Sequence, residues 1–162
     1  KLKLDQIWDV ADSVGRDTES TLNFLKSTDP SISFWIINAL KASLPSDKNN
    51  DEAFRHVTQT GHVEASIEAA AWLAEESRYS EKAIQVLINE LENPNWAISL
   101  RACRAIELLG LKAKQAAAPM KKLYSLNRHK KGDAALFLAF SSGAFLDKLG
   151  EETEAWDFTP KH

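Results

Sequence analysis

The chain has 162 residues, of which 44% are apolar and 27% are charged, and its formal net charge is −3 at pH 7. These values suit one folded domain with a shared core. They argue against a general nucleic-acid binder, because such domains are strongly basic. No apolar run approaches the roughly 20 residues of a membrane-spanning helix, and one cysteine excludes an internal disulfide framework.

The N-terminal part of the chain predicts three helices. The first covers residues 4–14 and the second residues 18–26, and the third follows the Asp29-Pro30 turn. The third helix carries an apolar stripe that neighbouring helices must cover: Ile32, Trp35, Ile36, Ala39 and Leu40. Residues 45–50 are rich in turn formers and predict a loop.

Three further helical hairpins are expected downstream. The first pairs residues 51–60 with residues 62–76, and the next pairs residues 80–91 with a helix that ends before Gly110. In the last hairpin, Pro119 should kink the first helix, because it lacks a backbone donor and clashes with the preceding turn. The partner helix runs through residues 135–149, and we expect residues 151–162 to dock as a cap or to be disordered.

The helices that begin with these turns share a pattern. Each places a small residue before a second small or apolar one, at Ala39-Leu40, Ala70-Ala71 and Ala105-Ile106. The second residues of these pairs lie 31 and 35 positions apart. Such a period predicts an all-α superhelix, a solenoid of about four helical hairpins after an N-terminal helix, with residues 1–150 as a single domain.

Two segments carry a resemblance to known repeats. DPSISFWIINAL and ENPNWAISLRACRAIELLGLKAKQAAAPMKKL resemble HEAT repeats, and more narrowly the HEAT-type region that follows the catalytic domain in a group of bacterial sulfatases. Phe34-Trp35 matches an aromatic pair of that region. The order of its later motifs is matched by Asn93-Pro94-Asn95-Trp96, Leu109-Gly110, Ala113-Lys114 and Ala118-Pro119. The resemblance covers residues 2–126.

The sequence also departs from these families. Where HEAT repeats often carry Val-Arg at the start of the second helix, this chain has Ile32-Ser33, Val63-Glu64 and Ile98-Ser99, so a ladder of arginines between repeats is not expected. The formylglycine motif of sulfatases, Cys/Ser-x-Pro/Ala-x-Arg, fails after Cys103, which is followed by Arg-Ala-Ile-Glu. We therefore expect no catalytic residue, cofactor or metal in this chain.

The resemblance implies a non-catalytic module cut from a longer protein. It would be the C-terminal domain of a secreted bacterial sulfatase, would pack on the catalytic domain of the same chain in the periplasm or outside the cell, and could contact a sulfated polymer. An alternative is a free-standing HEAT scaffold for protein partners, which would be cytoplasmic. A HEAT-fold enzyme such as a DNA glycosylase is a third hypothesis, which the charge balance disfavours.

Seven lysines and arginines and no acidic residue lie between residues 111 and 132. This basic segment is the candidate contact for an anionic glycan or an acidic protein surface, through Lys114, Lys121, Lys122, Arg128, Lys130 and Lys131. The steps of seven from Lys114 to Lys121 to Arg128 would place these three on one line of a helix. The alternative is a solvated face whose lysine stems cover apolar surface.

Cysteine and tryptophan side chains complete the candidates. Cys103 lies on an apolar face and is expected to be a core thiol. Of the five tryptophans, Trp8, Trp35 and Trp72 lie on apolar stripes and are predicted to be core residues. Trp96 and Trp156 are the candidates for exposed aromatic side chains that could stack on sugars, although packing between repeats is the alternative.

Overall fold

The computed structural model describes Asp5, residues 29–43, 48–59, 62–76 and 79–151, and Thr153. These residues form α-helices and one 3-10 helix, with no strand in the described part, so the prediction of an all-α fold is confirmed. The helices predicted at residues 6–14 and 18–26, with Trp8, lie outside the described residues, and so does Trp156.

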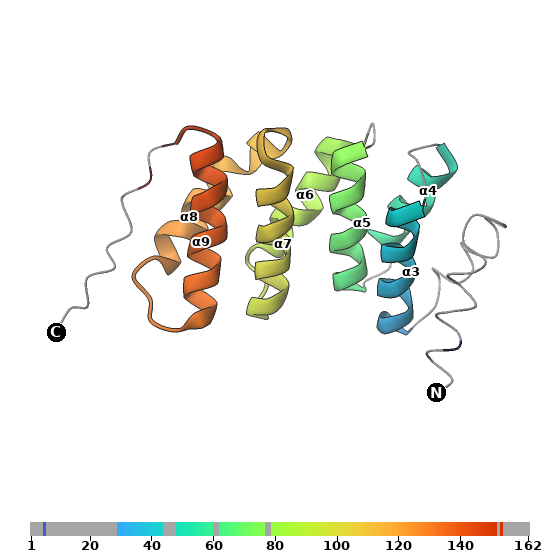
Figure 1. Ribbon diagram of the computed structural model, residues 1–162, viewed down its shortest axis with the longest axis horizontal. Coiled ribbons are helices and arrows are strands. Elements are labelled where there is room, and N and C mark those ends of the chain that lie inside the picture. The colour runs from blue at the N-terminus through green and yellow to red at the C-terminus, as the bar shows by residue number, and fades with distance from the viewer. Residues whose placement is uncertain are drawn as a thin grey trace.

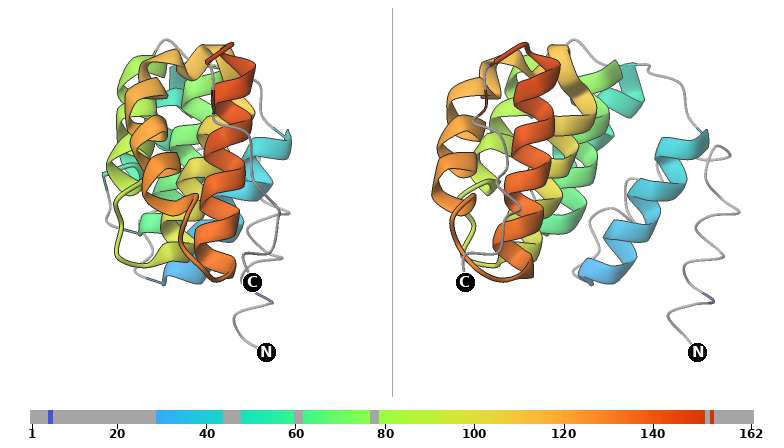
Figure 2. Two further views of the ribbon diagram at one scale, coloured as in Figure 1. Left: turned by 90° about the vertical axis from the view of Figure 1, so that its left-hand side faces the viewer. Right: turned by 60° about the vertical axis from the view of Figure 1, so that its left-hand side comes forward.

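The described helices lie in two layers. Figure 1 shows four of them side by side in one row, with the others behind, and Figure 2 shows the two layers from the end of the row. The front row is α3 (Pro30–Ser43), α5 (Val63–Glu76), α7 (Trp96–Leu109) and α9 (Asp133–Lys148). Behind it lie α4 (Lys48–Val57), α6 (Ser80–Glu90) and α8 (Ala117–Asn127), and η1 (Gly110–Ala116) joins α7 to α8.

Helix α7 shows how the sequence sets these boundaries. The Asn95 side chain caps its first turn by accepting the backbone N–H of Ala97 at 3.1 Å, and Asn93 Oδ1 accepts from the Asn95 N–H at 2.9 Å. At the other end Gly110 takes a positive φ of 53°, which a residue with a Cβ rarely adopts. The Asn-Pro start and the glycine end that the sequence predicts for this helix are therefore confirmed.

Helices α3, α5 and α7 share one register. Each has 14 residues, and they begin at Pro30, Val63 and Trp96, which are 33 residues apart. The same positions are buried in all three helices, so that in each one the third, fourth, seventh, eighth and eleventh residues form the covered face. The spacings of 31 and 35 were therefore wrong: Trp72-Leu73, rather than Ala70-Ala71, corresponds to Ala39-Leu40 and Ala105-Ile106.

A serine occupies the fourth position of each of these helices: Ser33, Ser66 and Ser99, all buried. Ser99 Oγ donates to the carbonyl oxygen of Leu91 at 2.6 Å, and Ser66 Oγ lies 3.4 Å from the equivalent carbonyl of Thr58. Each hydroxyl thus bonds the end of the preceding back-row helix. The comparison of Val63-Glu64 with Ile32-Ser33 was two residues out of register, because Ala65-Ser66 is the matching pair.

Two other local predictions were wrong. Pro119 does not kink a helix, because α8 begins at Ala117 and places the proline in its first turn, where backbone N–H groups have no helical acceptor. The chain changes direction earlier, in η1, where Ala113 has φ −96° and ψ 24°. The loop expected at residues 45–50 is shorter than predicted, since α4 already begins at Lys48.

The chain that follows α9 stays close to it in the part described. The Glu151 N–H donates to the Leu146 carbonyl at 3.0 Å, and Thr153 Oγ1 donates to Asp147 Oδ1 at 3.1 Å. Residues 152 and 154–162 lie outside the described part. Within that part no helix combines the length and the apolar character that crossing a bilayer requires.

Candidate interaction surfaces

The outer side of the front row exposes large apolar side chains. Trp96, Leu100, Arg104 and Leu108 follow one another at steps of four and form one ridge of α7. Trp96 is 49% exposed and Leu108 is 68% exposed. Phe137 and Phe140 on α9 are also about half exposed, and with the ridge they make up what we call the α7/α9 face.

Two grooves flank the ridge of α7. The groove between α5 and α7 has a volume of about 550 Å³, with Trp72 and Ala105 in its lining and Trp96 and Leu108 on the α7 side. The groove between α7 and α9 has a volume of about 390 Å³ and is lined in part by Phe137 and Phe140. Leu100 and Arg104 line both grooves, so the exposed apolar surface is continuous across α7.

Ion pairs cross the front row beside these grooves. Glu68 on α5 accepts from Lys41 Nζ on α3 at 2.6 Å and from Arg101 on α7 at 3.0 Å. Arg101 and Glu68 occupy the same position of their helices, 33 residues apart, and Trp35 occupies that position in α3. A polar ladder between neighbouring helices thus exists, although the sequence predicted none.

Trp35 is exposed, contrary to its predicted place in the core. Its relative accessibility is 53%, because its position in the helix is that of Glu68 and Arg101 on the outer side of the row. The apolar spacing of α3 alone could not separate this position from the buried one beside it. Trp72 is buried and stacks on Phe54 at 4.2 Å between ring centroids, as its core assignment requires, and Trp96 is exposed as predicted.

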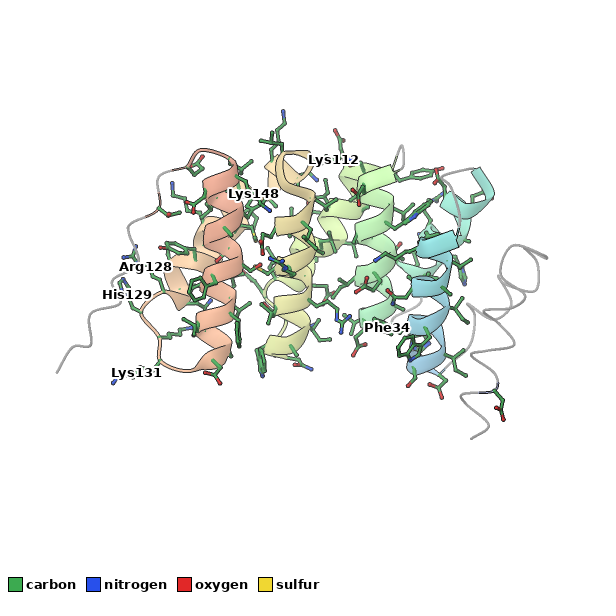
Figure 3. All side chains as sticks on the ribbon, viewed as in Figure 1. Phe34, Lys112, Arg128, His129, Lys131 and Lys148 are labelled. Carbon is green, nitrogen blue, oxygen red and sulfur yellow. The ribbon has the colours of Figure 1, made fainter. Side chains whose placement is uncertain are left out.

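The basic segment is divided among three places. Lys114 is exposed in η1, so it does not share a helix with Lys121 and Arg128, and the single row of three cations was wrong. His129, Lys130 and Lys131 are exposed in the turn between α8 and α9. Figure 3 shows Arg128, His129 and Lys131 at the left-hand end of the molecule, away from Lys112.

The cations on α8 have partners from other helices. Lys121 Nζ lies 3.2 Å from Glu151 Oε2, and Lys122 Nζ lies 2.5 Å from Glu92 Oε1, just after α6. The Lys122 ammonium group holds the pKa of the Glu92 carboxyl below its ordinary value through a hydrogen bond and its charge. The Arg128 guanidinium lies over the Tyr124 ring at 5.5 Å. These contacts favour a role of Lys121 and Lys122 in joining helices.

Cys103 is a buried thiol, as predicted. Its Sγ lies 3.8 Å from Met120 Sδ and 3.9 Å from the Leu138 carbonyl oxygen. Burial raises its pKa to about 12, so the nucleophilic thiolate is suppressed at neutral pH. Among the described residues, no three His, Cys, Asp or Glu side chains are grouped as metal ligands would be.

Glu107 is a buried carboxylate that the sequence analysis missed. It accepts a hydrogen bond from Ser141 Oγ on α9 at 2.7 Å, pairs with Arg104, and lies 4.0 Å from Lys148 Nζ. A signal was available, because Ser99, Cys103 and Glu107 lie at steps of four and all three are buried. An acidic residue on a buried line of a helix indicates a polar link to a neighbour.

Comparisons with protein-family models, with curated proteins and with solved structures found no match to this chain.

Proposed function

We propose that this chain is a non-catalytic, HEAT-like solenoid module that binds another protein surface through its α7/α9 face. The observation that carries the proposal is the exposed apolar ridge of α7 together with the two phenylalanines of α9. Contiguous apolar surface between grooves is typical of interaction sites. An arginine and a tryptophan within it are residue types that often dominate binding energy.

The shared register supports the solenoid part of the proposal. Three helices of equal length begin 33 residues apart, bury the same positions, and form the same serine bond where the described contacts include it. Repeats of this length, stacked so that each contacts its neighbours, are the mark of helical solenoids. Helix α9 completes the row but begins 37 residues after α7, so the last repeat is irregular.

The partner proposed first is the catalytic domain of a secreted bacterial sulfatase on the same chain. This identification rests on the motifs that resemble the sulfatase C-terminal region, such as Phe34-Trp35 and the Asn93-Pro94 turn. The alternative, a free-standing scaffold for other proteins, uses the same face. The exposed cations of the α8–α9 turn, Lys130 and Lys131, are the proposed contact for an anionic glycan.

The coding sequence that precedes Lys1 tests the identity of the partner. A sulfatase catalytic domain with its Cys/Ser-x-Pro/Ala-x-Arg motif would support the first partner, and a start codon directly before Lys1 would exclude it. The chain alone should not hydrolyse p-nitrophenyl sulfate, with or without calcium. Turnover that survives repurification and disappears in Cys103→Ala would contradict the non-catalytic assignment.

A binding assay tests the face itself. The catalytic domain, or the domain encoded beside the chain, is produced separately, and its affinity for the chain is measured by calorimetry. Leu108→Ser combined with Phe137→Ser should weaken binding by at least about tenfold, since each removes apolar area from the face. Leu126→Ser is the matched control, because Leu126 is 53% exposed on α8 in the back row. Equal losses in both variants would contradict the proposal.

Glycan binding at the turn has its own test. Heparin binding is measured at low and moderate salt for the wild type, for Lys130→Glu/Lys131→Glu and for Lys121→Glu/Lys122→Glu. The first variant should lose the salt-sensitive binding, and the second should keep most of it because Lys121 and Lys122 are paired with acids. No binding of the wild type at low salt would remove the anionic glycan from the proposal.

A further inference from the structure

A small pocket lies where α3, α5 and α7 meet, apart from the α7/α9 face. It is lined by Ser31, Phe34, Trp35, Glu64 and Arg101, and its volume is about 250 Å³. Figure 3 shows Phe34 near the lower end of α3. Pockets for drug-sized ligands measure roughly 300–1,000 Å³, so this one suits a single ring.

The aromatic floor of the pocket is held in place by its own contacts. The Phe34 and Trp35 rings meet edge to face, with centroids 5.8 Å apart and planes at 78°. The Arg101 guanidinium lies over the Phe34 ring at 5.0 Å and is also bonded to Glu68. A ligand would therefore meet a fixed guanidinium and an exposed indole, which reduces the entropy lost on binding.

The polar groups around the floor both donate and accept hydrogen bonds. The guanidinium of Arg101 is a donor, the carboxylate of Glu64 is an acceptor, and the hydroxyl of Ser31 can do either. A fully apolar ligand would leave these groups unpaired, which costs binding energy. The pocket thus fits a ring with one apolar face and a rim of hydroxyl groups.

The charges of the pocket favour a neutral ligand over a sulfated one. Glu64 lies in the lining, and the charge of Arg101 is already paired with Glu68 at 3.0 Å. A sulfate group would therefore meet two carboxylates and one engaged guanidinium. The cations of the α8–α9 turn lie at the far end of the row from α3 (Figure 3).

We propose that this pocket binds one neutral pyranose unit of a glycan, with the sugar's apolar face stacked on Trp35 and its hydroxyl groups bonded to Glu64 and Arg101. A pyranose ring matches the size of the pocket, its flat aromatic floor and its mixed donor and acceptor rim. Binding of a single unit is weak, so it adds specificity for a polymer rather than high affinity.

Saturation-transfer NMR tests this site on the wild-type chain with neutral tetrasaccharides of glucose, galactose, mannose and xylose, and with dextran sulfate. We expect transfer to at least one neutral tetrasaccharide at millimolar concentration. Trp35→Ala should lower the affinity by about tenfold. The matched control is Trp96→Ala, since Trp96 is 49% exposed against 53% for Trp35 but lies outside the pocket. Glu64→Ala, which leaves the floor intact, should also weaken binding.

Three results would overturn the proposal. The first is absence of transfer to all four neutral sugars, the second is binding of dextran sulfate alone, and the third is an equal loss in Trp35→Ala and Trp96→Ala. The pocket and the α7/α9 face can fail independently. Leu108→Ser/Phe137→Ser should bind the sugar normally, and Trp35→Ala should bind the partner domain normally.

Discussion

The two seams of α7 use the same kind of polar link at different depths. Toward α5 and α3, Glu68 bridges Lys41 and Arg101, and its side chain keeps 18% of its accessibility. Toward α9, Glu107 keeps only 8% and accepts from the hydroxyl of Ser141, which is itself buried. The first link lies at the rim of a groove, and the second lies within the interface.

This difference in depth determines what each link contributes. An ion pair at the rim gains little, because water screens the charges and the long side chains lose freedom. A buried carboxylate must be fully satisfied, since a polar partner left alone in the interior costs the desolvation energy of that group. We therefore expect the α7–α9 seam to be more sensitive than the α5–α7 seam to loss of its acid.

The largest expected effect comes from overpacking the two sides of α7. Ala102 is fully buried, whereas Ala105 is partly buried and lines the groove toward α5. Ala102→Trp should lower the free energy of unfolding by about 3 kcal/mol, because the interior has no space for an indole. Ala105→Trp should cost less than about 1 kcal/mol, since the groove can accept the ring. Urea denaturation measures both, and equal losses would show that the groove is not open.

Removing the buried acid comes next. Glu107→Ala should lower the free energy of unfolding by about 2 kcal/mol, because it leaves the hydroxyl of Ser141 without its acceptor inside the seam. Thermal and urea denaturation measure the loss. Arg104 and Lys148 are about half exposed, so water can solvate them in the variant.

Two further variants separate the hydrogen bond from the charge. Glu107→Gln keeps an acceptor for Ser141 and should lose less than Glu107→Ala. Glu107→Leu combined with Ser141→Ala removes both polar groups and should recover most of the stability. If the double variant is as unstable as Glu107→Ala, burial of an unpaired hydroxyl is not the reason for the loss.

Sequence patterns predicted the helices well where local chemistry decides. The Asn-Pro start and the Gly110 end of α7 follow from capping, and both are as expected. The stacking period was less accessible, because matching by small residues ignores which side of each helix is buried. The serines at positions 33, 66 and 99 carry the correct period in the sequence, but their role depends on carbonyls eight residues earlier in the chain.

The candidate sites were harder to predict than the helices. Composition marked the basic segment, yet the partners of Lys121 and Lys122 come from residues about 30 positions away, which no local pattern reveals. Likewise Trp35 satisfies helical spacing for a core residue and is nevertheless exposed. The pocket beside it combines residues from three helices, so it is visible only once the helices are placed together.

Removal of the rim acid should have a smaller effect than removal of Glu107. Glu68→Ala breaks two partly exposed pairs and should lower the free energy of unfolding by no more than about 1 kcal/mol. Raising the salt concentration should reduce the difference from the wild type further, because exposed charges are screened. A loss as large as that of Glu107→Ala would remove depth as the distinguishing feature of the two seams.

The smallest effect is expected at the fully exposed pair of Lys122 and Glu92, which extends the comparison to the back row. The lysine lowers the pKa of the Glu92 carboxyl below its ordinary value of 4.5. Because the folded-state pKa is the lower one, the pair stabilises the fold above the ordinary pKa, and this stabilisation is lost as the pH falls through the folded-state value. Carbon-detected NMR titration should place the Glu92 midpoint below 4.5 in the wild type and close to it in Lys122→Met. Lys121→Met, which removes a neighbouring lysine that pairs with Glu151 instead, should leave the midpoint unchanged. A midpoint that moves equally in both variants would mean that Glu92 senses the general positive charge of α8 rather than one partner across the helices.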